Sequence, residues 1–199
     1  MGGIGAVLDD ELEKARRTAD WAKSVILVEG ESDRRALDVL AVRLDRDLEA
    51  ERVLVIAIAG ATNIGRFLEI LPTPLGLSGL YDEAERHVLA RALETRRISG
   101  DDLEAQGFFM CRSDLEDELI RSVGVPGVLE VIEESGDIES WQRFSNQPAQ
   151  RGRPVNARLR RFLGTKSGRK IEYAGLLAAR IDVSRPSDSP LLRVLGYSH

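Results

Sequence analysis

Carboxylates follow three of the four short apolar runs in this sequence. SVILVEG (24–30) carries Glu29 near its end, LGLSGLY (75–81) leads into Asp82, and GFFMCR (107–112) leads into SDLEDEL (113–119). The acidic residues at these places are Glu29, Glu31, Asp33, Asp82, Glu83, Glu85, Asp114, Glu116, Asp117 and Glu118. Carboxylates held together repel one another unless cations neutralise them, and oxygen ligands select Mg²⁺, Mn²⁺ or Ca²⁺. The pattern predicts a divalent-metal site, provided that the runs end at one place.

The elements that would position these carboxylates are strands of a parallel sheet. The runs 24–30, 53–60, 75–81 and 107–112 are almost continuously apolar and rich in β-branched or aromatic residues, which predicts buried strands. Helical spacing of apolar residues occurs between successive runs, and no hairpin signal does, so right-handed crossovers should join parallel strands. Ligands bind outside the carboxyl ends of such strands. The three acidic groups should therefore meet at one edge.

Two other interpretations of the acidic residues stay open at this point. Acidic residues are common in the first turn of a helix, where the helix dipole favours them, and this accounts for Glu31, Glu83, Asp117 and Glu118. It does not account for Glu29, which ends an apolar strand directly before a glycine. A phosphoacceptor receiver domain also gathers carboxylates at this edge. It would need a lysine after a later strand of the same sheet, whereas Lys170 lies in a helical region.

Four motifs in order resemble Toprim domains, which occur in topoisomerases, primases and the OLD (overcoming lysogenization defect) nucleases. VILVEGESD resembles their opening strand and turn, and the spacing of Glu29 and Asp33 is similar to the OLD type. LYDEAE (80–85) occupies the place of the Toprim D-x-D motif, but Ala84 replaces the second aspartate and Glu85 follows it. SDLEDEL is similar to the OLD acidic motif. SGRKIEYAGLLA (167–178) resembles the helix that carries a lysine, which points to Lys170.

The resemblance spans about residues 24–181 and implies an α/β fold, a Toprim-like parallel sheet flanked by helices with a C-terminal helical extension. It implies a metal-dependent nuclease that hydrolyses phosphodiesters with two Mg²⁺ or Mn²⁺ ions. Lys170 and Glu29 would be catalytic, and the metal ligands would be Glu29, Asp33, Asp82, Glu85, Asp114 and Glu116. Because Ala84 departs from the motif, a non-catalytic or single-metal module that binds nucleic acid, or serves as a subunit, is the alternative.

The charge of the chain is distributed unevenly. Residues 140–170 contain nine basic and no acidic residues, although the net charge of the whole chain is −5. Such a stretch predicts contact with a polyanion; a solvated basic face is the alternative. The resemblance implies that the polyanion is nucleic acid, with DNA favoured over RNA and the choice between them left open. The candidate contacts are Arg151, Arg153, Arg158, Arg160, Arg161, Lys166 and Arg169.

The remaining features divide the chain and set its surroundings. We expect an N-terminal helix (1–23), the Toprim-like core (24–125), a basic helical extension (126–182) and a loosely structured tail (183–199). The sequence has no G-x-x-x-x-G-K-[ST] phosphate loop, so an ATPase would be a separate partner; a homo-oligomer also stays open. A single cysteine, Cys111, excludes an internal disulfide. No apolar run approaches the roughly 18 residues of a membrane span, and a cytoplasmic location is expected.

Overall fold

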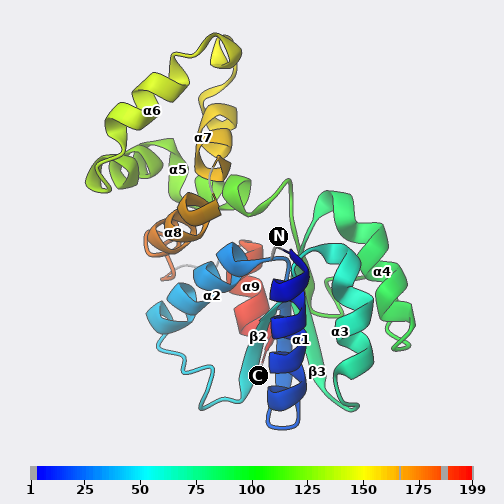
Figure 1. The fold of residues 1–199 in the computed structure, drawn as a ribbon. Coiled ribbons are helices and arrows are strands. Elements are labelled where there is room, and N and C mark those ends of the chain that lie inside the picture. Colours follow the sequence, from blue (N-terminus) through cyan, green and yellow to red (C-terminus); the bar gives the residue numbers. More distant parts are fainter. Residues whose placement is uncertain (1–3, 166, 185–187, 199) are drawn as a thin grey trace.

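Four parallel strands form the centre of the protein. The computed structural model describes residues 4–165, 167–184 and 188–198 (Figure 1). The strands are β1 (Ser24–Val28), β2 (Val53–Ala57), β3 (Gly76–Asp82) and β4 (Phe108–Cys111), in the order β2-β1-β3-β4. All four correspond to predicted strands. Since the chain passes from β1 to β2 on one side and returns to β3 on the other, the ends of β1 and β3 adjoin where the strand order reverses, which is where such sheets bind ligands.

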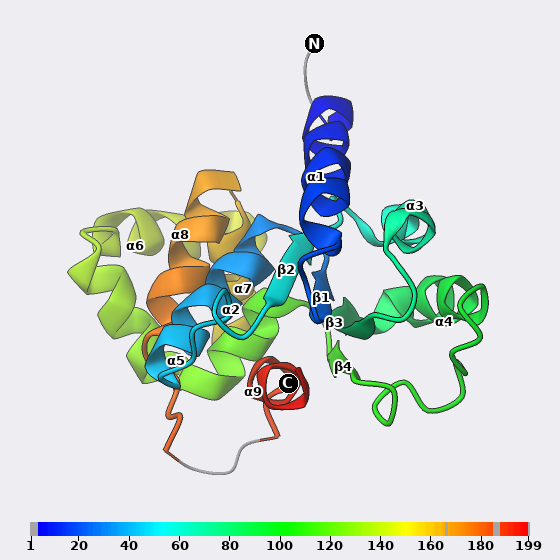
Figure 2. The ribbon, with the colours of Figure 1, turned by 90° about the horizontal axis from the view of Figure 1, so that it is seen from below.

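Helices cover both faces of the sheet. One face packs against α2 (Glu31–Arg43) and α9 (Pro190–Tyr197), and the other against α1 (Ile4–Ala19), α3 (Ile64–Ile70) and α4 (Arg86–Glu94) (Figure 2). Side chains of β1 alternate between these two cores, with Ile26 and Val28 in one and Val25 and Leu27 in the other. Burial on both faces explains why the strand sequences are continuously apolar.

The helical extension consists of α5 (Leu115–Glu134), α6 (Ile138–Ser145), the 3₁₀ turn η3 (Pro148–Gln150), α7 (Val155–Gly164) and α8 (Ser167–Ala178). α6 and α7 project away from the sheet (Figure 1). At Gly124 the backbone of α5 leaves the helical conformation (φ 77°, ψ 153°). α8 returns to pack on α2. There the Arg43 guanidinium donates a 3.0 Å hydrogen bond to the Ala178 carbonyl, which fastens the extension to the core.

The prediction of a loosely structured tail is wrong for residues 190–197. They form α9, and its residues Leu191, Val194 and Leu195 are fully buried. Their spacing is that of one helical face, and Pro190 occupies the first turn, where its missing N–H costs nothing. Arg46 donates hydrogen bonds to the carbonyls of Leu195 and Ser198 at the end of this helix. Within the described ranges, no helix is both long enough and apolar enough to cross a membrane.

Candidate metal centre

Three carboxylates meet where β1 and β3 end. Glu29 follows β1, Asp82 is the last residue of β3, and Glu85 lies in the 3₁₀ turn η2 (Glu83–Glu85). One oxygen from each lies within 4.8 Å of the others. Because η2 turns the chain once after Asp82, the side chain three residues later comes back beside it. Glu85 thereby supplies the carboxylate that Ala84 cannot, and all three residues were predicted as metal ligands.

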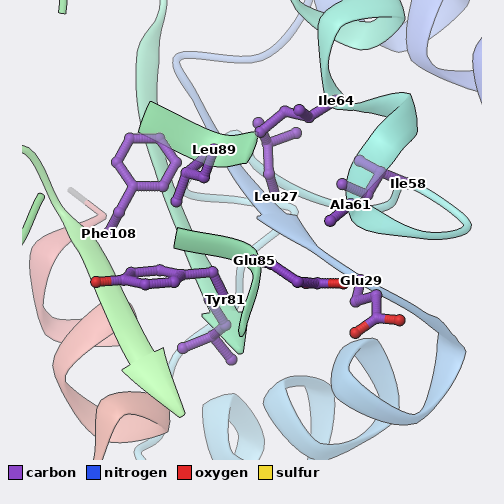
Figure 3. A pocket seen from close by; sticks show the side chains of 10 residues that line it. Leu27, Glu29, Ile58, Ala61, Ile64, Tyr81, Glu85, Leu89 and Phe108 are labelled. Atoms are coloured by element: carbon purple, nitrogen blue, oxygen red, sulfur yellow. The ribbon is translucent and has the colours of Figure 1, made fainter. Parts of the chain in front are cut away.

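Mostly apolar residues line a small cavity beside this cluster. Glu29 and Glu85 are among the side chains that line a cavity of about 20 Å³, room for about one water molecule (Figure 3). Its other lining residues are Leu27, Ile58, Ala61, Ile64, Leu80, Tyr81, Leu89 and Phe108. Burial raises the pKa of Asp82 to about 8, and the neighbouring charges of Glu29, Asp33 and Glu85 contribute to that rise. Burial and Glu29 also raise the pKa of Glu85. The cluster holds negative charge in a place where water stabilises it poorly.

A second acidic group, Asp33 and Glu116, lies beside the first. Asp33 is buried in the first turn of α2, and its Oδ2 accepts hydrogen bonds from the Gly30 amide (3.2 Å) and the Ser32 hydroxyl (3.4 Å). Burial raises the pKa of Asp33 to about 7, with Glu29 and Glu116 adding to the rise and Lys170 opposing it. Glu116 is buried in the first turn of α5, and this burial raises its pKa as well. The charges of Glu29 and Glu116 thus both act on Asp33.

Lys170 reaches this edge from the extension. Its Nζ lies 3.2 Å from Glu116 Oε1. Tyr173 and Leu177 lie on the same stripe of α8 as Lys170 and are 1% and 0% exposed, so this stripe faces inward. Burial works to lower the pKa of Lys170, but Glu116, Asp33 and Glu29 together outweigh it and raise that pKa. The ammonium is therefore charged near neutral pH.

The residues fit a divalent cation. Among the described residues, no lysine or arginine forms an ion pair with Glu29, Asp82 or Glu85, whereas Glu116 pairs with Lys170. Carboxylates gathered without a positive partner repel one another. The donor set is entirely carboxylate oxygen, which suits Mg²⁺ or Mn²⁺ and excludes metals that prefer sulfur or imidazole.

Asp114, also predicted as a metal ligand, is engaged elsewhere. It caps the N-terminus of α5, where its Oδ1 accepts a 2.9 Å hydrogen bond from the Asp117 amide. Its Oδ2 accepts a 2.6 Å hydrogen bond from Arg160 Nε on α7. Both oxygens of Asp114 thus have partners within the chain.

The predicted nucleic-acid contacts fall into two groups. Some are held by the protein: Arg160 by Asp114, Arg169 by Asp137 (3.4 Å) and by the Phe162 ring (4.3 Å), and Arg158 by the Ser145 hydroxyl (2.5 Å). Others are exposed and form no ion pair with the described residues, namely Arg151, Arg153 and Arg161, to which the structure adds Arg143. Lys166 lies outside the described residues. The acidic partners come from outside 140–170, so counting charges within that stretch missed them.

Asp137 is a residue that sequence reasoning missed. Besides Arg169, it accepts a 3.0 Å hydrogen bond from the Tyr173 hydroxyl. It thereby joins the start of α6 to α8, and it helps to raise the pKa of Tyr173 to about 12, where burial is the largest cause. Asp137 directly follows Gly136, and an aspartate at such a place is a common start of a helix, which is the signal that the sequence offered.

Comparisons with known proteins agree on the fold. Residues 21–78 match the family model described as overcoming lysogenization defect protein-like, TOPRIM domain. The C-terminal region of the Burkholderia pseudomallei OLD protein superposes with a TM-score of 0.65 at 22% identity, over 89% of this chain and 97% of that one. The same region of the Xanthomonas campestris pv. campestris OLD protein gives 0.64 at 22% identity, over 91% and 94%. No curated protein matches the chain. The chain has the Toprim fold of OLD C-terminal regions, as its motifs predicted.

Proposed function

Starting from this OLD-type Toprim fold, we propose that the protein is a metal-dependent nuclease that hydrolyses phosphodiester bonds, with DNA as its substrate. The main support is the set of charged side chains at the carboxyl edge of the sheet. Glu29, Asp82 and Glu85 lie together there, Asp33 and Glu116 lie beside them, and Lys170 reaches the same place. Clustered carboxylates with raised pKa values beside a charged lysine are costly to fold and are typical of functional sites.

The two carboxylate groups suggest two cation positions. Glu29, Asp82 and Glu85 would hold one cation, and Asp33 with Glu116 the other, with Glu29 near both. Bound Mg²⁺ or Mn²⁺ would supply an acidified water and neutralise charge on the phosphate and the leaving oxygen. In this proposal the protein's own part is to keep five carboxylates at fixed positions on strand ends and first helical turns.

Lys170 would stabilise the negative charge that develops on the phosphate in the transition state. Its ammonium is charged, and the inward stripe of α8 directs it to the edge. It contacts Glu116, so it must turn from that carboxylate to the substrate. A cation held by Glu116 would favour that movement, because it would repel the ammonium from its present position.

The exposed arginines Arg143, Arg151, Arg153 and Arg161 would contact the phosphate backbone with little sequence preference. They lie on the part of the extension that projects from the sheet (Figure 1). Partnership with a separate ATPase and assembly into a homo-oligomer remain predictions, as does a cytoplasmic location.

The alternative is a module that binds nucleic acid with one cation or without catalysis. Ala84 favours it, because Glu85 reaches the cluster from a different position than an aspartate at 84 would. The two functions differ in a direct measurement: the purified protein is incubated with supercoiled and linear DNA in Mg²⁺, Mn²⁺ or EDTA. A nuclease should cut in Mn²⁺ or Mg²⁺ and not in EDTA, and Glu29→Gln should remove the cutting. Binding without cutting in every metal would support the alternative.

A further inference from the structure

We propose that Asp114 orients Arg160 to bind a phosphate of the nucleic acid beside the metal centre and is not a metal ligand. The inference rests on the proposed nuclease function and assigns a substrate contact at that same site. It departs from the sequence prediction, in which Asp114 held a metal and Arg160 was one of several equivalent basic residues.

The carboxylate of Asp114 is fixed from two sides. Its Oδ1 caps α5 through the Asp117 amide at 2.9 Å, and its Oδ2 accepts from Arg160 Nε at 2.6 Å. The start of α5 is itself fixed, because Leu115 and Leu119 are 2% and 1% exposed. A metal that replaced these partners would undo a helix cap and a charge-assisted hydrogen bond as well.

The guanidinium of Arg160 keeps its phosphate-binding side available. Arginine has five N–H donors in a planar fork, and only Nε is occupied by Asp114. Within the part of the chain that the structure describes, the two terminal nitrogens have no hydrogen-bond partner, and the side chain is 43% exposed. A guanidinium held through Nε presents these terminal nitrogens as a preorganised pair, the geometry that binds phosphate oxygens bidentately.

The position of this pair distinguishes Arg160 from the other exposed arginines. Asp114 is two residues from Glu116, and its charge acts on both Asp82 and Glu116. Arg160 and Lys170 are thus the described basic residues of 140–170 whose ion pairs are with the acidic segment after β4. A phosphate bound by Arg160 would be a neighbour of the scissile phosphate. The charge of Arg160 would offset the repulsion between the carboxylates and the DNA backbone.

Arg161 provides a matched control for this inference. It is the next residue of α7, it is exposed, and it has no ion pair among the described residues. Both side chains carry the same charge, so a general basic face would lose the same affinity from either substitution.

The test measures two affinities on the full chain. Binding of a labelled DNA duplex in Ca²⁺ is followed by fluorescence anisotropy for wild type, Arg160→Ala, Arg160→Lys, Arg161→Ala, Asp114→Asn and the double variant Asp114→Asn with Arg160→Ala. We expect Arg160→Ala to weaken binding about tenfold and Arg161→Ala about twofold. Lysine should restore only part of the loss, since it lacks the fork. Asp114→Asn alone should weaken binding, and combining it with Arg160→Ala should cause no further loss of affinity.

Mn²⁺ binding by calorimetry is the second arm. Asparagine is a good N-cap, so Asp114→Asn should fold and should bind Mn²⁺ as wild type does, while Glu29→Gln should not. Equal losses of DNA affinity from Arg160→Ala and Arg161→Ala would overturn the proposal. So would a loss of Mn²⁺ affinity in Asp114→Asn as large as that in Glu29→Gln. If wild type binds no DNA in Ca²⁺ at all, the proposed function fails first and this inference fails with it.

Discussion

The acidic edge of the sheet and the basic helical extension carry opposite charges and are assembled in opposite ways. The carboxylates of the edge come from distant parts of the sequence and are brought together by β1, β3, α2 and α5. The basic residues of the extension are neighbours in sequence, yet the structure separates them into internal ion pairs and an exposed remainder. In this protein, charge concentrated by the fold indicates a site more reliably than charge concentrated by the sequence.

The largest effect should come from removing one carboxylate of the edge. Glu29→Gln takes away an oxygen ligand that lies near both acidic groups, so it should abolish cleavage and the rise in melting temperature that millimolar Mn²⁺ gives wild type. Thermal unfolding with and without Mn²⁺ measures this. Glu31→Gln is the control, because Glu31 pairs with Arg34 and should leave the shift intact. An unchanged Mn²⁺ shift in Glu29→Gln would remove Glu29 from the metal site.

A second large effect should distinguish Lys170, which reaches the acidic edge, from the exposed basic residues of the extension. Lys170→Met should lower the cleavage rate roughly 10²- to 10³-fold, because its charge is placed against the reacting phosphate, and should barely change DNA affinity in Ca²⁺. Arg153, which is exposed and donates to the Ala149 carbonyl, is the contrast. Arg153→Met should lower affinity slightly and leave the rate at saturating DNA unchanged. If both variants lose rate and affinity equally, Lys170 is one more surface cation.

The difference between the regions also decides what the sequence could predict. The strand ends were predictable, because continuous apolar runs specify buried parallel strands and topology then places Glu29 and Asp82 at one edge. Lys170 was predictable only from the resemblance of SGRKIEYAGLLA to a helix that carries a lysine. The pairing of Arg160 with Asp114 was not, since the two are 46 positions apart and meet only through the path of α5 and α7. No local pattern shows which of nine cations faces a carboxylate.

An effect of intermediate size concerns the dependence of stability on pH, which tests the burial of carboxylates at the acidic edge. In the folded protein without divalent metal, the pKa values of Asp33 and Asp82 are about 7 and about 8. Unfolded carboxyls titrate near 4. Between about pH 4 and pH 8 the folded state therefore holds more protons than the unfolded state, and stability should fall as pH rises.

Melting temperatures in EDTA should accordingly drop by several degrees between pH 5 and pH 8, at about 2–4 °C per kcal/mol for a chain of this size. Asp82→Asn should flatten this dependence, whereas Asp10→Asn, at an exposed position of α1, should not. Mn²⁺ should stabilise the protein more at pH 8 than at pH 5, because protons compete for the same oxygens. A melting temperature that rises steadily across this range would contradict the raised pKa values.

The smallest effect on cleavage should come from the exposed part of the extension. Replacing Arg151, Arg153 and Arg161 with alanine removes three charges that project into solvent, and these residues contribute to binding only through the phosphate backbone. Affinity for DNA should fall roughly tenfold, and the slope of log K against log salt should flatten by about 0.9 for each phosphate of the duplex that the variant no longer neutralises. The rate at saturating DNA should stay the same, because, among the described residues, none of the three pairs with a carboxylate of the acidic edge.

Titrations at several salt concentrations measure the slope, and Arg91→Ala, at an exposed position of α4 outside the extension, is a control for charge alone. An unchanged slope in the triple variant would mean that DNA contacts the protein through the edge and Arg160, and that the exposed arginines form a solvated face.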